Sequence, residues 1–412
     1  MRRYLSLAAL AASFLFLIGT QAGCGGGNSN TPASGLDQRV FIAIQNSSVS
    51  RLEIANAAKD QLTASSASGV GSAPSLMIPG ANNTTLVFGS GDNSVSVVDN
   101  IKETAATNVT TGCANSQTFC PPTLPAATES IAASSDGKFA YAALPTASQV
   151  SVLALTAGPP ITVTNIPATL ANCTTTSNCL PGAHRVVLSH NNAKLLVFNE
   201  SLDQFEIINT SDNSVKTVTG TGLDRPSYGV FSADDSKAYI LNCGAECGGH
   251  QASVSVLDTS ALTISQTVPV DAATIGINDT NNLYVAGTGA NGGSATVLPL
   301  SSLTPGKPIG IGNGFHQVIS LFQNKVIIGA RTCSTGCMSI VDPAAGAAVI
   351  DTAKGDVTSI TPITPRKVVY ATEGGEVRIY DVTTGQELLS NNTQLIDVVG
   401  KAASVLYVGP KM

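Results

Sequence analysis

Short apolar runs alternate with polar turns from residue 39 to the end of the chain. Four stretches show this pattern most clearly, at residues 82–99, 135–155, 234–262 and 364–381. In each, a turn rich in Asn, Asp, Gly or Pro leads into an apolar strand, a second polar turn follows, and an alternating strand comes next. This pattern predicts repeated antiparallel hairpins rather than helices.

The hairpins recur at a spacing typical of propeller blades. Copies aligned just before the apolar core of their first strand fall at Arg39, Thr85, Lys138, Lys194, Lys237, Asn282, Lys325, Lys367 and Ser404. A further apolar segment precedes most of them, at residues 73–79, 129–134, 184–189, 225–231, 273–278, 316–321, 357–363 and 394–400. We therefore predict four-stranded antiparallel blades in meander order, numbered first to fourth strand from the axis outward.

Two segments also resemble a known repeat. The segments "GKFAYAA" (137–143) and "SVSVLDTSAL" (253–262) are similar to the YVTN-type propeller repeat of bacterial and archaeal secreted proteins. The resemblance spans about residues 39–412 and implies an all-β propeller. Its motifs are degenerate, so it implies a fold and no particular activity.

The number of inner segments favours eight blades. Eight such segments divide the repeat region into blades of about 47 residues, an ordinary size. The chain starts and stops at strands of the same kind, residues 39–44 and 404–409, so we expect both ends to share one blade and close the ring. Nine second-strand copies for eight places keep seven blades open as an alternative. Residues 38–412 are interpreted as a single propeller domain.

The first 23 residues have the pattern of an export signal. Two arginines precede an apolar run at residues 4–18, and small residues lead to Cys24. The "QAGC" segment resembles a bacterial lipoprotein signal, which implies a lipid on Cys24, although Gln21 stands where Leu is usual. Residues 24–37 then form a flexible tether. The alternative is ordinary cleavage after "TQA", which leaves a soluble secreted protein.

Eight of the nine cysteines fall into close pairs, and Cys24 is left over. This clustering favours four local disulfides, because an exported chain lives where disulfides persist. The spacings match neither a haem-attachment nor a zinc motif. The predicted pairs are Cys113 with Cys120, Cys173 with Cys179, Cys243 with Cys247 and Cys333 with Cys337.

Strand direction places all four pairs at one end of the ring. In a meander blade, the loops that enter the first strand and those between the second and third strands share one end, which we call the disulfide face. Loops held on a rigid scaffold commonly carry binding sites. Candidate ligand-binding residues at the axial mouth of this face are Glu129, His184, Arg185, Arg225, His250, His316 and Gln317, with Asp271 and Asp356 near them.

Charge and composition narrow the partners. Charged residues make up only 12%, the net charge is −6, and no basic cluster follows the first three residues, so nucleic acid is not an expected partner. The histidines are scattered without metal-ligand spacing, so neither a metal nor a cofactor is predicted. The recurring Asp99, Asp258, Asp342 and Asp381 at strand ends are interpreted as turn formers.

These observations predict an exported, lipid-anchored propeller that acts as a non-enzymatic binding or scaffolding module of the bacterial cell envelope. We expect a monomer, at the outer membrane or facing the periplasm, that meets an envelope protein or glycan through the disulfide face. One alternative is a metal-assisted, lactonase-like hydrolase that uses His184, His316 and Glu129. A structural envelope protein without a discrete ligand is the other.

Overall fold

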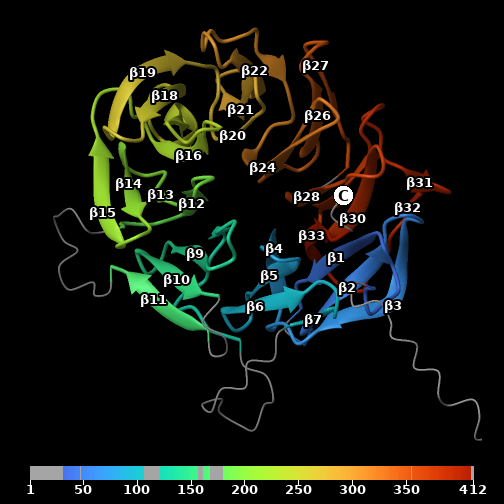
Figure 1. Cartoon of the computed structure of the whole chain (residues 1–412). Coiled ribbons are helices and arrows are strands. Elements are labelled where there is room, and N and C mark those ends of the chain that lie inside the picture. The colour runs from blue at the N-terminus through green and yellow to red at the C-terminus, as the bar shows by residue number, and fades with distance from the viewer. Residues whose placement is uncertain are drawn as a thin grey trace, which may run out of the picture.

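The computed structural model describes residues 31–46, 48–105, 121–155, 161–167, 180–353 and 355–409. Within these ranges the chain forms β-strands and a single short 3₁₀ turn, η1 (Gly244–Cys247). The sheets stand side by side around a central axis, so the molecule is a ring (Figure 1). No helix in the described ranges has the length and apolarity to cross a membrane. The predicted all-β class is confirmed.

Most sheets are four-stranded antiparallel meanders, in agreement with the prediction. Five of these sheets have no strand that is hydrogen-bonded to another sheet. They are β8 (Ile131–Ala133), β9 (Phe139–Leu144), β10 (Gln149–Ala154) and β11 (Thr162–Ile166); β12 (Arg185–Leu188), β13 (Lys194–Phe198), β14 (Gln204–Asn209) and β15 (Ser214–Thr219); β16 (Pro226–Phe231), β17 (Lys237–Asn242), β18 (Ser253–Asp258) and β19 (Thr263–Pro269); β20 (Ile275–Asn278), β21 (Asn282–Gly289), β22 (Gly292–Pro299) and β23 (Ile309–Gly310); and β24 (Phe315–Phe322), β25 (Lys325–Arg331), β26 (Met338–Asp342) and β27 (Ala347–Ile350).

Strands from both ends of the chain share one sheet. The order is β33 (Ala402–Tyr407), β1 (Arg39–Ile44), β2 (Arg51–Asn56) and β3 (Gln61–Ser68), and β33 pairs antiparallel with β1. A parallel bridge from β3 to β7 extends this sheet to β4 (Pro74–Pro79), β5 (Thr84–Gly89), β6 (Ser94–Asp99) and β7 (Thr104–Ala105). In Figure 1 the red β33 lies beside the blue β1, next to the axis.

Residues 394–400 were expected to form a first strand, and the three-stranded sheet next to them shows that this prediction is wrong. That sheet contains β28 (Val357–Ile363), β29 (Val368–Glu373) and β30 (Glu376–Asp381). Ile396 forms a β-bridge with Val377 on β30, the third strand of this sheet, and the hairpin of β31 (Leu389–Ser390) and β32 (Thr393–Gln394) precedes it. The segment therefore lies at the outer edge of the sheet, away from the axis. The strand at Ser404, expected as a second strand, instead occupies the inner position beside β1. Apolar content alone does not separate inner from outer strands.

A serine motif explains why the turn between first and second strands recurs. The serine hydroxyl donates to the side-chain oxygen two residues later, and it accepts the N–H of the residue five positions on. Such contacts between side chain and backbone fix tight turns. The three clearest copies are Ser134 with Asp136 and Phe139, Ser189 with Asn191 and Lys194, and Ser232 with Asp234 and Lys237.

The aspartates at the ends of third strands are turn formers, as interpreted from the sequence. One carboxylate oxygen of each accepts two consecutive backbone N–H groups in the turn to the fourth strand. The four cases are Asp99 with Ile101 and Lys102, Asp258 with Ser260 and Ala261, Asp342 with Ala344 and Ala345, and Asp381 with Thr383 and Thr384. Their carboxylates are therefore occupied by local structure.

Neighbouring inner strands are held together by serine hydroxyls. The N–H of Met77 donates to Ser404 Oγ at 3.3 Å, and the N–H of Val186 donates to Ser130 Oγ at 3.1 Å. Ser227 Oγ donates to the carbonyl of Thr274 at 3.0 Å, and Ser359 Oγ to that of Val405 at 3.1 Å. Each contact links an inner strand to its neighbour around the ring. They give polar backbone groups partners at the crowded centre of the ring.

Polar contacts also join strands away from the axis. The buried Arg39 on β1 and Glu103, just before β7, form an ion pair of 3.1 Å. Arg366 pairs with Asp60, which also accepts the Tyr370 hydroxyl at 2.6 Å, so the sheet of β29 is fastened to that of β2. Both contacts involve the sheet that contains β33 and β1.

Glycine permits a close approach between neighbouring sheets at β20. On the inner strand β20, a Cβ at Gly276 would lie 2.8 Å from Leu241 Cδ1 of the preceding sheet and 2.8 Å from the carbonyl oxygen of Tyr284. Backbone cannot easily move away from such a contact. Gly310, on the outer strand β23, has no atom within 4 Å of the same position.

We expect Gly276→Ala to lower the free energy of unfolding by about 2 kcal/mol, because an added methyl group overpacks this contact. Gly310→Ala is the matched control, for which a change below about 0.5 kcal/mol is expected. Urea denaturation of both variants checks this. Equal stability of the two variants would contradict the proposed close packing of β20.

Candidate functional site

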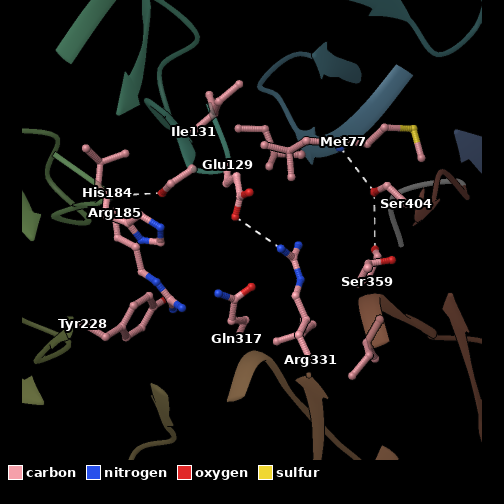
Figure 2. A pocket seen from close by; sticks show the side chains of 17 residues that line it. Met77, Glu129, Ile131, His184, Arg185, Tyr228, Gln317, Arg331, Ser359 and Ser404 are labelled. Carbon is pink, nitrogen blue, oxygen red and sulfur yellow. Dashed lines mark hydrogen bonds and ion pairs between the residues drawn. The ribbon is translucent and has the colours of Figure 1, made fainter. Parts of the chain in front are cut away.

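A cavity of about 310 Å³ lies at the axis, between the inner strands (Figure 2). It is near the beginnings of several of these strands, and the end of β25 reaches it as well, so strand direction places its mouth on the disulfide face. The inner strands and the residues just before them contribute most of its wall. It is formed by Leu76, Met77, Ile78, Glu129, Ser130, Ile131, His184, Arg185, Val186, Tyr228, Gln317, Val318, Arg331, Thr358, Ser359, Ile360 and Ser404.

Arg185 is a buried polar side chain of the cavity with contacts on several sides. Its side chain is 8% exposed, and its Nε lies 3.2 Å from Glu200 Oε1. The guanidinium carbon lies 5.8 Å from the ring centroid of Tyr228 and 6.0 Å from that of Phe315, within range of cation–π attraction. No hydrogen bond to another described residue engages its two terminal nitrogens. The side chain is thus oriented with donor capacity to spare.

Glu200 supplies the negative charge beneath this arginine. Burial raises the pKa of Glu200, but the opposing effects of His184, whose Nδ1 lies 3.4 Å from Oε1, and of Arg185 are larger. The net effect holds the pKa below its ordinary value. Glu200 is therefore ionised at neutral pH, and the charge of Arg185 is balanced inside the protein.

A second ion pair crosses the cavity. Arg331 Nη1, from the end of β25, donates to Glu129 Oε2 at 3.2 Å, and 202 residues separate the two in sequence. The side chains are 32% and 58% exposed. A solvent-accessible pair of this kind contributes less than about 1 kcal/mol. Another anion can therefore replace Glu129 at little cost.

The other walls divide into a polar and an apolar part. Gln317 has no side-chain hydrogen bond within the described residues, and Ser404 Oγ donates to Ser359 Oγ at 3.4 Å. Figure 2 shows Gln317 between Arg185 and Arg331, with the serine pair on one side. Aliphatic side chains, among them Met77 and Ile131, form the rest.

Four of the predicted ligand-binding residues meet at this cavity: Glu129, His184, Arg185 and Gln317. His316 does not. It is 2% exposed, its Nε2 donates to the carbonyl of Gly312 at 3.0 Å, and burial lowers its pKa to about 4. The alternative in which His184, His316 and Glu129 form a catalytic group at the mouth does not fit this geometry, because His316 is buried against Gly312 and does not line the cavity.

Arg225 and His250 also lie apart from the cavity. Arg225 donates to the carbonyl of Ser201 and has its Nε 3.8 Å from Asp203, so it packs between two loops. The His250 side chain is 95% exposed, 3.8 Å from Asp224. Both residues are on the disulfide face, but strand direction fixes only the end of the ring and not the distance from the axis.

Sequence reasoning missed Arg331, Glu200 and Tyr228. Arg331 ends the second strand β25 and Glu200 follows the second strand β13, so the same rule of strand direction places both on the disulfide face. Applied to the ends of second strands, the rule would have found them. Tyr228 gave no signal, because an aromatic residue within an inner strand resembles any core residue.

Two of the predicted disulfides are present and local. Cys243–Cys247 and Cys333–Cys337 lie between the second and third strands of their sheets, as expected. Cys333 and Cys337 come close to Asp356, but thiols joined in a disulfide cannot ligate a metal as thiolates.

The other two predicted disulfides are not confirmed. Cys113 and Cys120 lie outside the described residues, and so do Cys173 and Cys179. The pairing of Cys120 with Cys113 and that of Cys179 with Cys173 therefore stay predictions from the sequence. Cys24 and the signal segment before it also lie outside the described residues.

The Cys243–Cys247 loop also contacts the next sheet. It contains Glu246, whose Oε2 accepts the backbone N–H of Thr288 at 2.9 Å and the hydroxyl of Thr274. Burial raises the pKa of Glu246. The disulfide therefore fixes a loop that joins two sheets, which is more than a glycine turn would do.

The comparisons with known proteins support the fold alone. No family model and no curated protein matches the chain. A solved structure described as dihydro-heme d1 dehydrogenase NirN in complex with DHE is similar with a TM-score of 0.60 and 10% identity, over 92% of this chain and 79% of the other. The RRP9 WD40 repeats match with a TM-score of 0.51 and 12% identity, over 69% and 85%. The chain is a β-propeller.

A double-mutant cycle tests the buried pair of Arg185 and Glu200. At pH 7, Arg185→Gln and Glu200→Gln should each lower the free energy of unfolding by about 3 kcal/mol, because each leaves an unpaired buried charge. The double variant should lose less than the sum, with a coupling of at least about 1 kcal/mol.

The coupling should also depend on pH. The folded pKa of Glu200 lies below the ordinary value of 4.5, so its contribution to stability is present above pH 4.5 and is lost as the pH falls further. Additive losses at pH 7 would contradict the ion pair.

Proposed function

We propose that this protein is a non-enzymatic binding module of the bacterial cell envelope, anchored by lipid and with its ligand site at the axial mouth. The cavity carries this proposal, because side chains from separate sheets converge there with donor groups that have no partner in the described chain. A concave site with a few fixed polar groups is the usual form of a ligand site. Its position on the disulfide face supports the same role.

An eight-bladed ring gives this site its rigidity. In this arrangement β33, β1, β2 and β3 make one blade, and β28 to β30 with residues 386–396 make the blade before it. The pairing of β33 with β1 supports closure through the two chain ends. The sequence contains nine candidate second strands for eight blades. Because the strand at Ser404 is an inner strand, eight second strands remain, one for each blade.

Binding is favoured over hydrolysis by the contacts of the cavity hydroxyls. Ser130 Oγ accepts the N–H of Val186, and the hydroxyls of Ser359 and Ser404 bond to each other and to backbone groups. A serine nucleophile requires a base within hydrogen-bond reach. The lining histidine, His184, instead has Nδ1 beside Glu200. These contacts suit a binding wall.

The N-terminal sequence supports location at a membrane. The export signal of residues 1–23 is followed by Cys24. Within the predicted tether, Ser34 already bonds to Glu103 of the propeller, so the part before it, residues 24–33, reaches at most about 35 Å when extended. A diacylated cysteine anchors stably where one chain would not. The observed local disulfides agree with an oxidising compartment.

Cys24→Ala should move the protein from the membrane fraction to the soluble fraction, because it removes the only proposed lipid-bearing residue. Asn28→Ala, in the same tether, is the control and should leave the partition unchanged. Fractionation and immunoblotting of the expressing bacterium measure this. Unchanged membrane partition of Cys24→Ala would reject the anchor.

Filling the cavity tests the site. Gln317→Trp should abolish retention of the Cys24→Ala protein on isolated cell envelopes, because the larger ring occupies the axial space. Thr219→Trp, at an exposed position of the outer strand β15, should be retained like the parent. Co-sedimentation measures both. Equal retention of the two Trp variants would show that the cavity is not the binding site, and a parent that is not retained would favour a structural protein without a ligand.

A further inference from the structure

The charges on the cavity wall are unequal. Two arginines, Arg185 and Arg331, line it, and Glu129 is the single carboxylate among the lining residues. Glu200 lies behind Arg185 and neutralises it from below, through Nε. The outer ends of the guanidinium group therefore remain available to the cavity. A ligand with acceptor oxygens would provide partners for these donor groups of Arg185.

The geometry of Arg185 suits a planar oxyanion. Its contacts with Glu200 and with the rings of Tyr228 and Phe315 hold the guanidinium plane in one orientation. A guanidinium with two free terminal nitrogens binds a carboxylate through two parallel hydrogen bonds. Because the side chain is 8% exposed and already ordered, little conformational entropy is lost on binding.

Glu129 occupies the place of such a carboxylate at the second arginine. It reaches Arg331 across the cavity in an exposed and therefore weak pair. A ligand carboxylate within the cavity competes with Glu129 for the same cation. Glu129 therefore takes the position at Arg331 that a ligand carboxylate would take, and it weakens the binding of an acidic ligand.

Size and wall chemistry narrow the ligand. A cavity of 310 Å³ holds the volume of about ten waters, enough for one sugar ring and a carboxylate. The Gln317 amide, which has no side-chain hydrogen bond within the described residues, suits a hydroxyl group, and the aliphatic wall suits the apolar face of a ring. Building on the proposed function, we propose that the axial cavity binds a uronic acid unit of an acidic glycan, with its carboxylate on Arg185.

Isothermal titration calorimetry on the full mature chain with Cys24→Ala tests this with three probes. Glucuronate should bind, and glucose, which lacks the carboxylate, should bind at least tenfold more weakly. N-acetyl-Ala-Ala, which carries a carboxylate on a peptide, should also bind at least tenfold more weakly. Raising the salt from 50 to 500 mM should weaken glucuronate and leave glucose unchanged, since only the charged probe is screened.

Two variants should move glucuronate affinity in opposite directions. Glu129→Gln should strengthen it about threefold or more, because the competing carboxylate is removed at an exposed position. The double variant Arg185→Gln/Glu200→Gln keeps the charge balance of the buried pair and should weaken it at least tenfold. The double variant Arg51→Gln/Glu53→Gln removes a surface pair on β2 with the same net change of charge as the cavity double variant, so it is the matched control and should change nothing.

The outcomes separate this inference from the proposed function. Equal binding of glucose and glucuronate, or no effect of either cavity variant, overturns the carboxylate assignment. Preferential binding of N-acetyl-Ala-Ala overturns the sugar assignment and favours a peptide C-terminus. If no probe binds while Gln317→Trp still loses envelope retention, the uronic acid inference fails and the binding module stands. If Gln317→Trp is also retained, both fail.

Discussion

The close approach of neighbouring inner strands at the axis is the constraint on which the structure depends. Sheets that fan out from one axis crowd their first strands together, so the side chains there must be small and the polar backbone groups must still find partners. Gly276 meets the steric requirement, and Ser130, Ser227, Ser359 and Ser404 meet the polar one. Among the larger side chains at this end, Arg185, Tyr228 and Gln317 line the cavity.

The same crowding explains why the candidate site is preorganised. Glu129, Arg185, Gln317 and Arg331 come from three sheets, yet each is placed by a strand that is packed on its neighbours. Contacts farther out, such as the ion pair of Arg39 with Glu103 and the Cys243–Cys247 loop with its contact to Thr288, restrain neighbouring strands. Because these outer contacts restrain the strands, they also fix the positions of the side chains at the axis, as expected for a binding site built on a scaffold.

Much of the fold was predictable because its signals are local. For example, the alternating pattern of residues 253–258 predicts a strand, and Asp258 at its end forms the following turn by accepting the N–H groups of Ser260 and Ala261. What failed was the choice between strands of similar content, at 394–400 and 402–407, because only tertiary pairing with β30 and β1 distinguishes them. Likewise, strand direction placed Arg225 and Arg185 at the same end, but the radial position that separates them depends on packing that no local pattern encodes.

The central claim is that the axial cavity receives a ligand carboxylate at Arg185. The most direct measurement is a crystal structure of the mature chain with sodium glucuronate. We expect density for the sugar acid between Arg185 and Arg331, with Glu129 turned away from Arg331. Glucuronate bound elsewhere, with the pair of Glu129 and Arg331 intact and the cavity filled only by water, would contradict it.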